Sequence, residues 1–325
     1  MGEEAVGVRL CHPAGPGTGR YGMAVIMEGK PLLLKTREEV RKRVERLKEM
    51  GVTPGLAAIL TEDDPTSKLY VSKKVKDCAK CGIYSEVWEV YRERPEMRER
   101  ELMRLISSLN SRHDISGILV QLPLPGYIDV HRVLEAIDPS KDVDGLTPTN
   151  RGRWMGRYDP ERDLLPCTAI GIIELLDHYR VDVSGSLVAI VGRSDLVGKP
   201  LFKLLLDRDA TPVLTHTRTR GSRKVIQMAD VVICAVGRPP EIYGEAGFKL
   251  TGDMIKEGAV VINVGIKRTP DGSVFYDVDF ESVLERASYV TRNDAVGYMT
   301  RARLLKNTVI AAEGFARQLI VRGLV

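Results

Sequence analysis

The stretch that decides the fold is L-V-A-I-V-G-R-S-D-L-V-G-K-P, which runs from Leu187 to Pro200. Its unbroken apolar start ends at Gly192, and the polar residues 193–195 follow. Apolar residues then recur at helical spacing as far as Leu205. The pattern predicts a buried strand, a glycine turn and a helix, which together form the opening unit of a parallel α/β domain.

The glycine turn is a candidate phosphate site. The first backbone N–H groups of a helix have no partner within the helix, so this end of a helix favours anions. Gly192 and Gly198 would give the backbone its freedom, and Arg193 and Ser194 are the side chains placed to contact a phosphate. The full G-x-G-x-x-G fingerprint is absent because Ser194 stands where the second glycine would be. Many α/β turns carry a glycine and bind nothing, so the turn alone leaves both interpretations open.

Composition and charge narrow the class of protein. A chain of 325 residues is long enough for two domains, and 43% hydrophobic with 28% charged residues is typical of a globular protein. The net charge of +4 is spread along the chain, which favours small anionic ligands and does not indicate nucleic-acid binding. No apolar run approaches the roughly 18 residues of a membrane span, so we expect no membrane association.

Cysteine usage indicates a reducing compartment. The five cysteines are odd in number and have no framework spacing, which favours a cytoplasmic protein. The C-x-x-C at Cys78 and Cys81 has no second pair or nearby His, so we expect two helix residues there and no metal site. Residues 1–22 lack the features of a signal or transit peptide and are predicted to be a flexible extension, with organellar targeting left open.

The first half of the chain alternates between helix and strand patterns. Helices are predicted at residues 37–50, 67–81, 97–109 and 131–137, and strands at residues 56–60, 86–90 and 115–122. This alternation predicts a small α/β domain that spans residues 23–147.

The second half repeats the strand-and-turn unit. Strands are predicted at residues 187–191, 212–215, 231–236, 260–264 and 289–291, after a region at 148–166 that crosses between the domains. Residues 148–299 should therefore form a Rossmann-type doubly wound parallel sheet, with ligands bound beyond the carboxyl ends of its strands. A final helix at residues 300–319, within the terminal segment 300–325, is long enough to return to the first domain.

The end of the second strand of this sheet indicates which dinucleotide would bind. In such sites a carboxylate at this position favours NAD, and basic or hydroxyl groups accept the additional phosphate of NADP. The sequence here is T-H-T-R-T-R at residues 215–220, so Thr217 and Arg218 favour NADP. The alternative is that Arg218 and Arg220 belong to an ordinary solvated loop.

Several motifs, taken together, carry a family resemblance. They are Y-V-S-K-K-V-K-D-C at 70–78, G-I-L-V-Q-L-P-L-P at 117–125, K-D-V-D-G-L at 141–146, P-C-T at 166–168, V-G-R-S-D-L-V-G-K-P at 191–200, A-D-V-V-I-C-A-V-G-R-P at 229–239 and I-N-V-G-I at 262–266. In this order and spacing the chain resembles the bifunctional methylenetetrahydrofolate dehydrogenase/methenyltetrahydrofolate cyclohydrolase family, from about residue 23 to the C-terminus.

The resemblance implies a pair of reactions in one-carbon metabolism. Such an enzyme is an oxidoreductase that converts 5,10-methylenetetrahydrofolate to 5,10-methenyltetrahydrofolate with NADP, and a hydrolase that opens the product to 10-formyltetrahydrofolate. It also implies a homodimer, and a link to purine biosynthesis. The implied domains are a folate-binding catalytic domain at 23–147, completed by the C-terminal helix at 300–325, and an NADP-binding domain at 148–299.

The resemblance assigns catalytic roles in the first domain. Lys74 is implied as the central group, because a Lys whose pKa is lowered by its surroundings can move a proton during water attack. Tyr70 lies one helical turn before Lys74, and Gln121 is implied to hydrogen-bond it. Asp144 would accept hydrogen bonds from the N–H edge of the pterin, and Gly297 would also contact the substrate.

The resemblance assigns cofactor contacts in the second domain as well. Beside the turn residues and the end of the second strand, it implies Val236, Gly237, Gly265 and Ile266. Without the resemblance, a Lys among four other helical lysines, a Gln at a strand end and an Asp in a D-G pair would each be ordinary surface or turn residues. Cys167 is expected to be structural, and at most near the cofactor.

One segment departs from the family pattern. Where the family has T-P-V-P-G-G-V-G-P-M-T, this chain reads T-R-N-D-A-V-G-Y-M-T at residues 291–300, which is one residue shorter. The loss of prolines and glycines must reshape the loop, and Gly297 alone of its glycines clearly remains. Smaller departures are Ala169 after P-C-T and Tyr276 before Asp277. We therefore expect the folate pocket to be better preserved than the nicotinamide side.

Two other functions stay open on the sequence. One is a shikimate-dehydrogenase-like oxidoreductase, which would share the G-R-S turn without needing the motifs of the first domain. The other is a folate- or nucleotide-binding homologue in which the altered segment 291–300 impairs dehydrogenase turnover.

Overall fold

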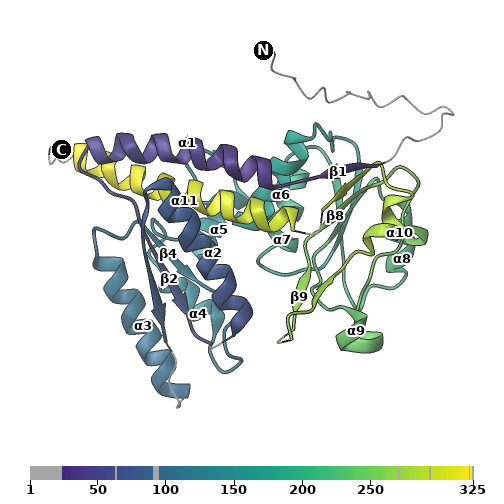
Figure 1. Cartoon of the computed structure of the whole chain (residues 1–325), viewed down its shortest axis with the longest axis horizontal. Coiled ribbons are helices and arrows are strands. Elements are labelled where there is room, and N and C mark those ends of the chain that lie inside the picture. The colour runs from purple at the N-terminus through teal and green to yellow at the C-terminus, as the bar shows by residue number, and fades with distance from the viewer. Residues whose placement is uncertain are drawn as a thin grey trace, which may run out of the picture.

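A computed structural model describes residues 24–62, 64–90, 95–269, 271–292, 294–321 and 323. The chain folds into two α/β domains, one around a three-stranded parallel sheet and one around a six-stranded parallel sheet (Figure 1). The long helices α1 (Lys30–Glu49) and α11 (Ala295–Val321) run side by side along the top of the first domain and reach the second (Figure 1). The extension predicted at residues 1–22 lies outside the described residues.

The first sheet is built on a fully buried central strand. It comprises β2 (Gly55–Leu60), β3 (Tyr84–Glu89) and β4 (Gly117–Val120), in the order β3-β2-β4. Leu56, Ala58 and Leu60 face the core formed with α1, α11 and α2 (Pro65–Cys81). Ala57 and Ile59 face α3 (Pro95–Ser111) and α4 (Val130–Glu135), as the alternation of side chains along a strand requires.

The second sheet is the predicted doubly wound sheet. Its strands are β1 (Val25–Met27), β5 (Leu187–Val191), β6 (Thr211–Thr215), β7 (Val231–Cys234), β8 (Val260–Asn263) and β11 (Tyr289–Thr291), in the order β1-β11-β8-β7-β5-β6. Leaving β1 aside, this is the 2-1-3-4-5 order, whose direction of winding reverses between β5 and β7. A crevice for a ligand is therefore expected beyond the carboxyl ends of these two strands.

Helices cover both faces of this sheet. One face packs against α6 (Cys167–His178) and α7 (Gly198–Leu206), and the other against α8 (Ser222–Met228) and α10 (Phe280–Leu284). A hairpin of β9 (Ile266–Arg268) and β10 (Val274–Tyr276) projects from the end of β8 (Figure 1). The remaining elements are α5 (Pro148–Met155), α9 (Pro240–Tyr243), η1 (Gly244–Ala246) and η2 (Gly252–Met254).

The structure corrects where the first domain begins. Residues 25–27, predicted within it, form β1 and pair in parallel with β11 of the second sheet, Val25 opposite Tyr289. A short apolar strand is stabilised by a sheet edge that offers free backbone groups, and β11 provides such an edge for residues 25–27. The second sheet thus takes its sixth strand from the other end of the sequence.

Two helix boundaries and one connection also differ from prediction. Helix α1 begins at Lys30 and not at residue 37, with Pro31 in its first turn, where proline needs no N–H partner. Residues 148–166, predicted as a crossing region, include α5, which is capped by the Thr147 hydroxyl that accepts from Asn150 N–H.

Helix α11 begins at Ala295, five residues before the predicted start at 300. This chain lacks the prolines and glycines that would break a helix here, so residues 295–300 form helix instead of an open loop. The altered segment is therefore mainly helical. A helix of 27 residues spans about 40 Å, and α11 packs on α1, α2 and α6, so the predicted return to the first domain is confirmed.

Among the described residues, no helix combines the length and apolar character needed to cross a membrane.

Candidate functional site

Lys74 and Gln121 meet at the carboxyl end of the first sheet. Lys74 lies on α2, and its Nζ donates a hydrogen bond to Gln121 Oε1 at 3.0 Å. Gln121 follows β4 directly, and its backbone N–H donates to Ile59 O at 2.9 Å, which extends the ladder with β2. The Gln121 amide nitrogen donates to Leu122 O at 2.8 Å, which turns the amide oxygen toward the amine. The sheet therefore holds an acceptor in front of Lys74.

Asp144 lies in a tight turn beside this pair. The neighbouring Gly145 has φ of +66°, and a Cβ there would lie 2.6 Å from the carbonyl carbon of Leu165, so only glycine fits. Desolvation raises the pKa of the Asp144 carboxyl, the charge of Lys74 acts against this, and the charge of Asp142 adds to it. A partly buried carboxylate facing an ammonium group suits a ligand that presents hydrogen-bond donors.

These residues share one cleft of about 260 Å³. Its walls come from both domains, with Tyr70, Lys74, Gln121 and Asp144 on one side and Val264 and Ile266 on the other. The remaining lining residues are Val120, Leu122, Leu146, Cys167, Thr168, Leu196, Val197, Val296, Gly297, Thr300 and Arg301. Six of the predicted site residues are thereby brought together: the four first-domain residues, Gly297 and Ile266.

Gly297 lies in the first turn of α11, at the wall of the cleft. A Cβ at this position would meet no protein atom within 4 Å, so the protein itself does not require a glycine there. The space is open to a ligand. Thr300, one turn later, meets Thr168 of α6 through their hydroxyl oxygens at 3.1 Å, which ties the two helices at the floor of the cleft.

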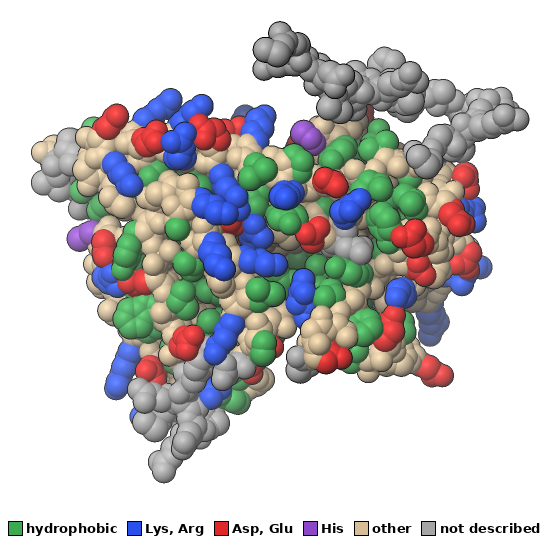
Figure 2. Space-filling model, viewed as in Figure 1, with side chains coloured by type: hydrophobic (Ala, Val, Ile, Leu, Met, Phe, Trp, Pro, Cys, Tyr) green, Lys and Arg blue, Asp and Glu red, His purple; other side chains and the backbone are tan. Residues whose placement is uncertain are grey.

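Cationic groups gather where the two domains meet. Figure 2 shows Lys and Arg side chains near the middle of this face, between α2 and the second domain. Desolvation, with the charges of Arg268 and Arg301, lowers the pKa of Lys73, one residue before Lys74. Arg301 is held by an ion pair from its Nε to Asp77 Oδ2 at 2.6 Å. The positive potential of this region favours an anionic ligand.

The glycine turn after β5 has the close backbone contacts of a cradle. Gly192 has φ of +127°, and a Cβ there would lie 2.4 Å from Ala235 O at the end of β7. A Cβ at Gly198 would lie 2.4 Å from Gly192 O. Both glycines are required by the fold, and α7 begins at the second. Arg193 and Ser194 are exposed, and the Ser194 hydroxyl accepts from Val197 N–H at 3.2 Å.

The end of β6 lies beside this turn. Gly192 N–H donates to Thr215 O at 2.9 Å, so the segment 216–220 borders the crevice at the reversal point. Thr217 and Arg218 are exposed there. Arg218 N–H donates to His216 Nδ1 at 3.2 Å, which closes the loop on itself.

Asp277 is a residue of the second domain that the sequence did not single out. Its buried carboxylate accepts from Val236 N–H at 2.6 Å and Gly237 N–H at 2.9 Å, which fixes the loop after β7. A Cβ at Gly265 would lie 1.9 Å from Asp277 Oδ2, so three predicted cofactor residues surround this one side chain. Desolvation raises the pKa of Asp277, and the two N–H groups act against it.

Other lining residues were also missed. Thr168, Thr300 and Arg301 line the cleft, but their only sequence signal was the place of Thr168 in P-C-T and of the other two in the predicted C-terminal helix. Cys167, predicted to be structural and at most near the cofactor, lines the cleft, and its thiol donates to Val143 O at 3.3 Å. Burial raises the pKa of this thiol well above its usual range, so it stays protonated. The C-x-x-C residues Cys78 and Cys81 are buried and free.

The chain matches two family models that together cover most of it. The catalytic domain of tetrahydrofolate dehydrogenase/cyclohydrolase matches residues 27–144, and the NAD(P)-binding domain of the same enzymes matches residues 166–316. The chain is 48% identical over 297 residues to the bifunctional protein FolD of Pyrobaculum calidifontis, which covers 90% of this chain and 96% of that protein. It is 45% identical to FolD of Nautilia profundicola, over 90% of this chain and 99% of that protein.

Solved structures give the same result. The bifunctional FolD methylenetetrahydrofolate dehydrogenase/cyclohydrolase of Campylobacter jejuni superposes with a TM-score of 0.81 at 38% identity, over 90% of this chain and 99% of that chain. The enzyme of Trypanosoma brucei, solved with NADP cofactor and an inhibitor, superposes with a TM-score of 0.82 at 31% identity, over 91% of this chain and 99% of that one.

Proposed function

Because the chain belongs to the tetrahydrofolate dehydrogenase/cyclohydrolase family, we propose that it oxidises 5,10-methylenetetrahydrofolate with NADP and hydrolyses the methenyl product to 10-formyltetrahydrofolate. One observation carries the proposal: the Lys74 amine, held by Gln121, lies in a cleft walled by both domains. The relatives described as bifunctional match about nine-tenths of this chain. The shikimate-dehydrogenase-like and turnover-impaired alternatives are therefore not favoured.

We propose that Lys74 moves the proton when water attacks the methenyl carbon. In this step a C–O bond forms, a C–N bond of the ring breaks, and the proton lost by water must reach the departing nitrogen. An amine within the cleft can pass that proton on, and general acid–base groups of this kind contribute about 10²–10⁴-fold. Gln121 accepts from Nζ and so points the amine into the cleft, and Tyr70 lines the same wall one turn earlier on α2.

The pterin would lie against Asp144 and Gly297. Asp144 offers two acceptor oxygens to the N–H edge of the ring, and Gly297, which lines the same cleft, leaves space for the ring. We assign residues 23–147 and the C-terminal helix 300–325 to the folate-binding catalytic domain, apart from the strand β1. Residues 148–299 form the NADP-binding domain in this proposal.

The residues of the second domain fit a dinucleotide. The turn from Gly192 to Gly198 brings backbone so close that side chains are excluded, which is what a pyrophosphate cradle needs. We propose that Arg193, Ser194, Thr217 and Arg218 contact the phosphates, and that Val236, Gly237, Gly265 and Ile266 border the nicotinamide end. When bound, NADP supplies the hydride acceptor. The absence of a carboxylate in T-H-T-R-T-R favours NADP over NAD.

We further propose a cytoplasmic homodimer that supplies one-carbon units for purine biosynthesis. The free, buried cysteines Cys78, Cys81, Cys167 and Cys234 support a reducing compartment. Gel filtration with light scattering tests the dimer.

The activity is tested by following the absorbance of methenyltetrahydrofolate. Purified protein given methylenetetrahydrofolate and NADP should form the methenyl compound and then consume it, and NAD should support the first step much less well. Added methenyltetrahydrofolate should be hydrolysed without any nucleotide. No absorbance change with either nucleotide, despite measurable folate binding, would contradict the proposal.

A further inference from the structure

A buried polar pair on α11 lies directly behind the turn that carries Asp144. Arg303 and Asn307 are both 0% exposed and lie one helical turn apart. Arg303 Nε donates to Asn307 Oδ1 at 2.8 Å. A guanidinium nitrogen is only a donor, so this bond fixes which way the Asn307 amide faces. Its nitrogen must point away from Arg303.

The Asn307 amide nitrogen uses both of its hydrogens on two separate segments. It donates to Val143 O at 2.7 Å and to Leu165 O at 2.8 Å. Val143 immediately precedes Asp144, and Leu165 immediately precedes P-C-T, where α6 begins. The Asn307 side chain therefore links the turn that carries Asp144 to the segment that crosses between the domains.

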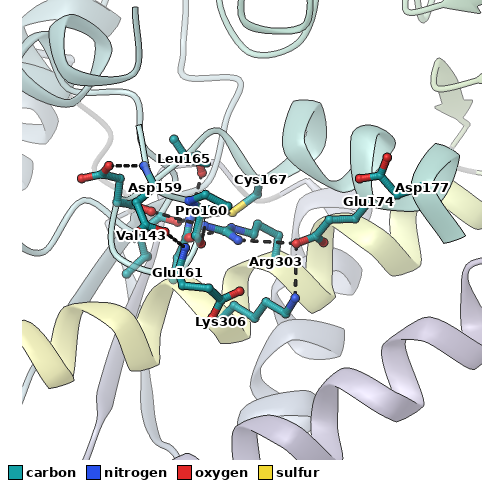
Figure 3. Close-up of polar contacts among 12 residues, drawn as sticks. Val143, Asp159, Pro160, Glu161, Leu165, Cys167, Glu174, Asp177, Arg303 and Lys306 are labelled. Carbon is teal, nitrogen blue, oxygen red and sulfur yellow. Dashed lines mark hydrogen bonds and ion pairs between the residues drawn. The ribbon is translucent and has the colours of Figure 1, made fainter. Parts of the chain in front are cut away.

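Arg303 anchors the same region from the other side. Its Nη2 donates to Pro160 O at 2.7 Å, and its Nη1 lies 3.4 Å from Glu174 Oε1 on α6 (Figure 3). Lys306 shares that carboxylate at 3.3 Å. Arg303 thus joins α11, the crossing segment and α6. Burying a guanidinium group costs desolvation free energy, which is offset only where its hydrogen-bond partners are fixed.

These contacts bear on substrate binding because Asn307 holds the carbonyl group of Val143, directly before Asp144. They act together with the Cys167 thiol, which also donates to Val143 O, and with Trp154 Nε1, which donates to Gly145 O at 3.0 Å. The turn is packed so tightly that a Cβ at Gly145 would clash with the carbonyl carbon of Leu165, so the two segments move together. We propose that Arg303 and Asn307 are positioning residues that set the distance between the Asp144 carboxylate and the rest of the cleft, and hence the affinity for the pterin. This inference rests on the proposed function.

Two variants of Asn307 separate positioning from general stability. Asn307→Leu removes both donors and the acceptor for Arg303 at similar volume. Asn307→Asp keeps an acceptor for Arg303 but puts a carboxylate oxygen, in place of the amide donor, against the carbonyl oxygens of Val143 and Leu165. Thr308→Val is the matched control, since the buried Thr308 hydroxyl donates to Leu304 O within the same helix. Thermal unfolding and the Kd for NADP, measured by fluorescence, report whether each variant is folded.

Both Asn307 variants should raise the KM for methylenetetrahydrofolate at least about tenfold, because a charged acceptor misplaced by a fraction of an ångström loses its bonds. The kcat and the Kd for NADP should stay near wild type, and Thr308→Val should change neither. In an Asp144→Asn background, Asn307→Leu should add about twofold or less, because it acts through a group already removed.

A wild-type KM in both Asn307 variants would overturn the inference, as would fully multiplicative effects in the double variant. A fall in NADP affinity that parallels the rise in KM would also overturn it, since that result indicates a general loss of structure. Wild-type protein inactive on methylenetetrahydrofolate would instead contradict the proposed function.

Discussion

The first-domain wall of the cleft and the glycine turn of the second domain are built in different ways. On the first-domain side, Lys74 is hydrogen-bonded to the Gln121 side chain, whose amide donates to the backbone O of Leu122. Asp144 is fixed by the packing of its turn. On the second-domain side, the turn at Gly192 is defined by backbone contacts, while Arg193 is exposed. The first-domain side therefore acts through the functional groups of its side chains, and the glycine turn acts through the shape of its backbone. Changes to the two sides should separate hydrolysis from nucleotide binding.

The largest effect is expected from Lys74→Met. Loss of the proton-transfer group should lower cyclohydrolase kcat by about 10²–10⁴-fold, and the Kd for NADP should not change because the second domain is untouched. Lys76→Met is the matched control, since Lys76 is exposed on the same helix. A Lys74→Met protein that hydrolyses methenyltetrahydrofolate at the wild-type rate would remove Lys74 from the mechanism.

Gly192→Ala should instead weaken NADP binding and leave the hydrolysis of methenyltetrahydrofolate intact. The added Cβ meets Ala235 O at 2.4 Å and the backbone is in a region strained for alanine, so the turn must shift at a cost of about 1–3 kcal/mol. The KM for NADP should rise about 10–100-fold while hydrolysis of methenyltetrahydrofolate is retained. Gly185→Ala is the control, because Gly185 also has positive φ but meets nothing within 4 Å. Equal loss of both activities would show that the two sides are not separable.

A smaller effect is expected from Asp277→Asn. An amide oxygen in the place of Oδ2 still accepts from Val236 N–H and, at 3.1 Å, from Gly237 N–H. The amide NH2 then replaces Oδ1, the acceptor 2.9 Å from Gly237 N–H, with a donor, so the loop after β7 should loosen. We expect the KM for NADP to rise by about tenfold or less, with folate KM unchanged. The control is Asp271→Asn, at an exposed Asp between β9 and β10. An unchanged KM for NADP would show that Asp277 does not hold the cofactor side.

The smallest effect is a dependence on pH. Desolvation raises the pKa of Asp144 above its ordinary value of 3.8, so the carboxylate that accepts from the pterin is lost at a higher pH than for a free Asp. The KM for folate should rise as pH falls through the raised pKa, by about tenfold per pH unit at most. The effect of Asp144 on the free energy of unfolding has the opposite dependence on pH from its effect on folate binding. Its raised pKa in the folded chain stabilises the fold at low pH, and this stabilisation is lost as the pH rises through the raised pKa. In Asp144→Asn the folate KM should be flat over this range, and a remaining slope would assign the titration to another group.

The sequence alone determined many local elements and the chemistry of single motifs, although β1 and α5 were not predicted and the starts of α1 and α11 were placed too late. The run from Leu187 to Val191 followed by Gly192 could only be a buried strand and a turn, and the structure has that strand at the predicted bounds. Y-x-x-x-K places Tyr70 and Lys74 on one face because helical spacing does so in any context. These features depend on neighbours along the chain, which the sequence contains.

What the tertiary structure decided are the contacts between distant segments. Strand β1 joined β11 across more than half of the chain, Asp277 turned toward Val236 and Gly237, and Asn307 reached Val143 and Leu165. No periodicity encodes such pairs, because a buried donor or acceptor finds its partner in whichever segment packs against it. Side-chain identity thus fixed what each group can do, and packing fixed which groups do it together.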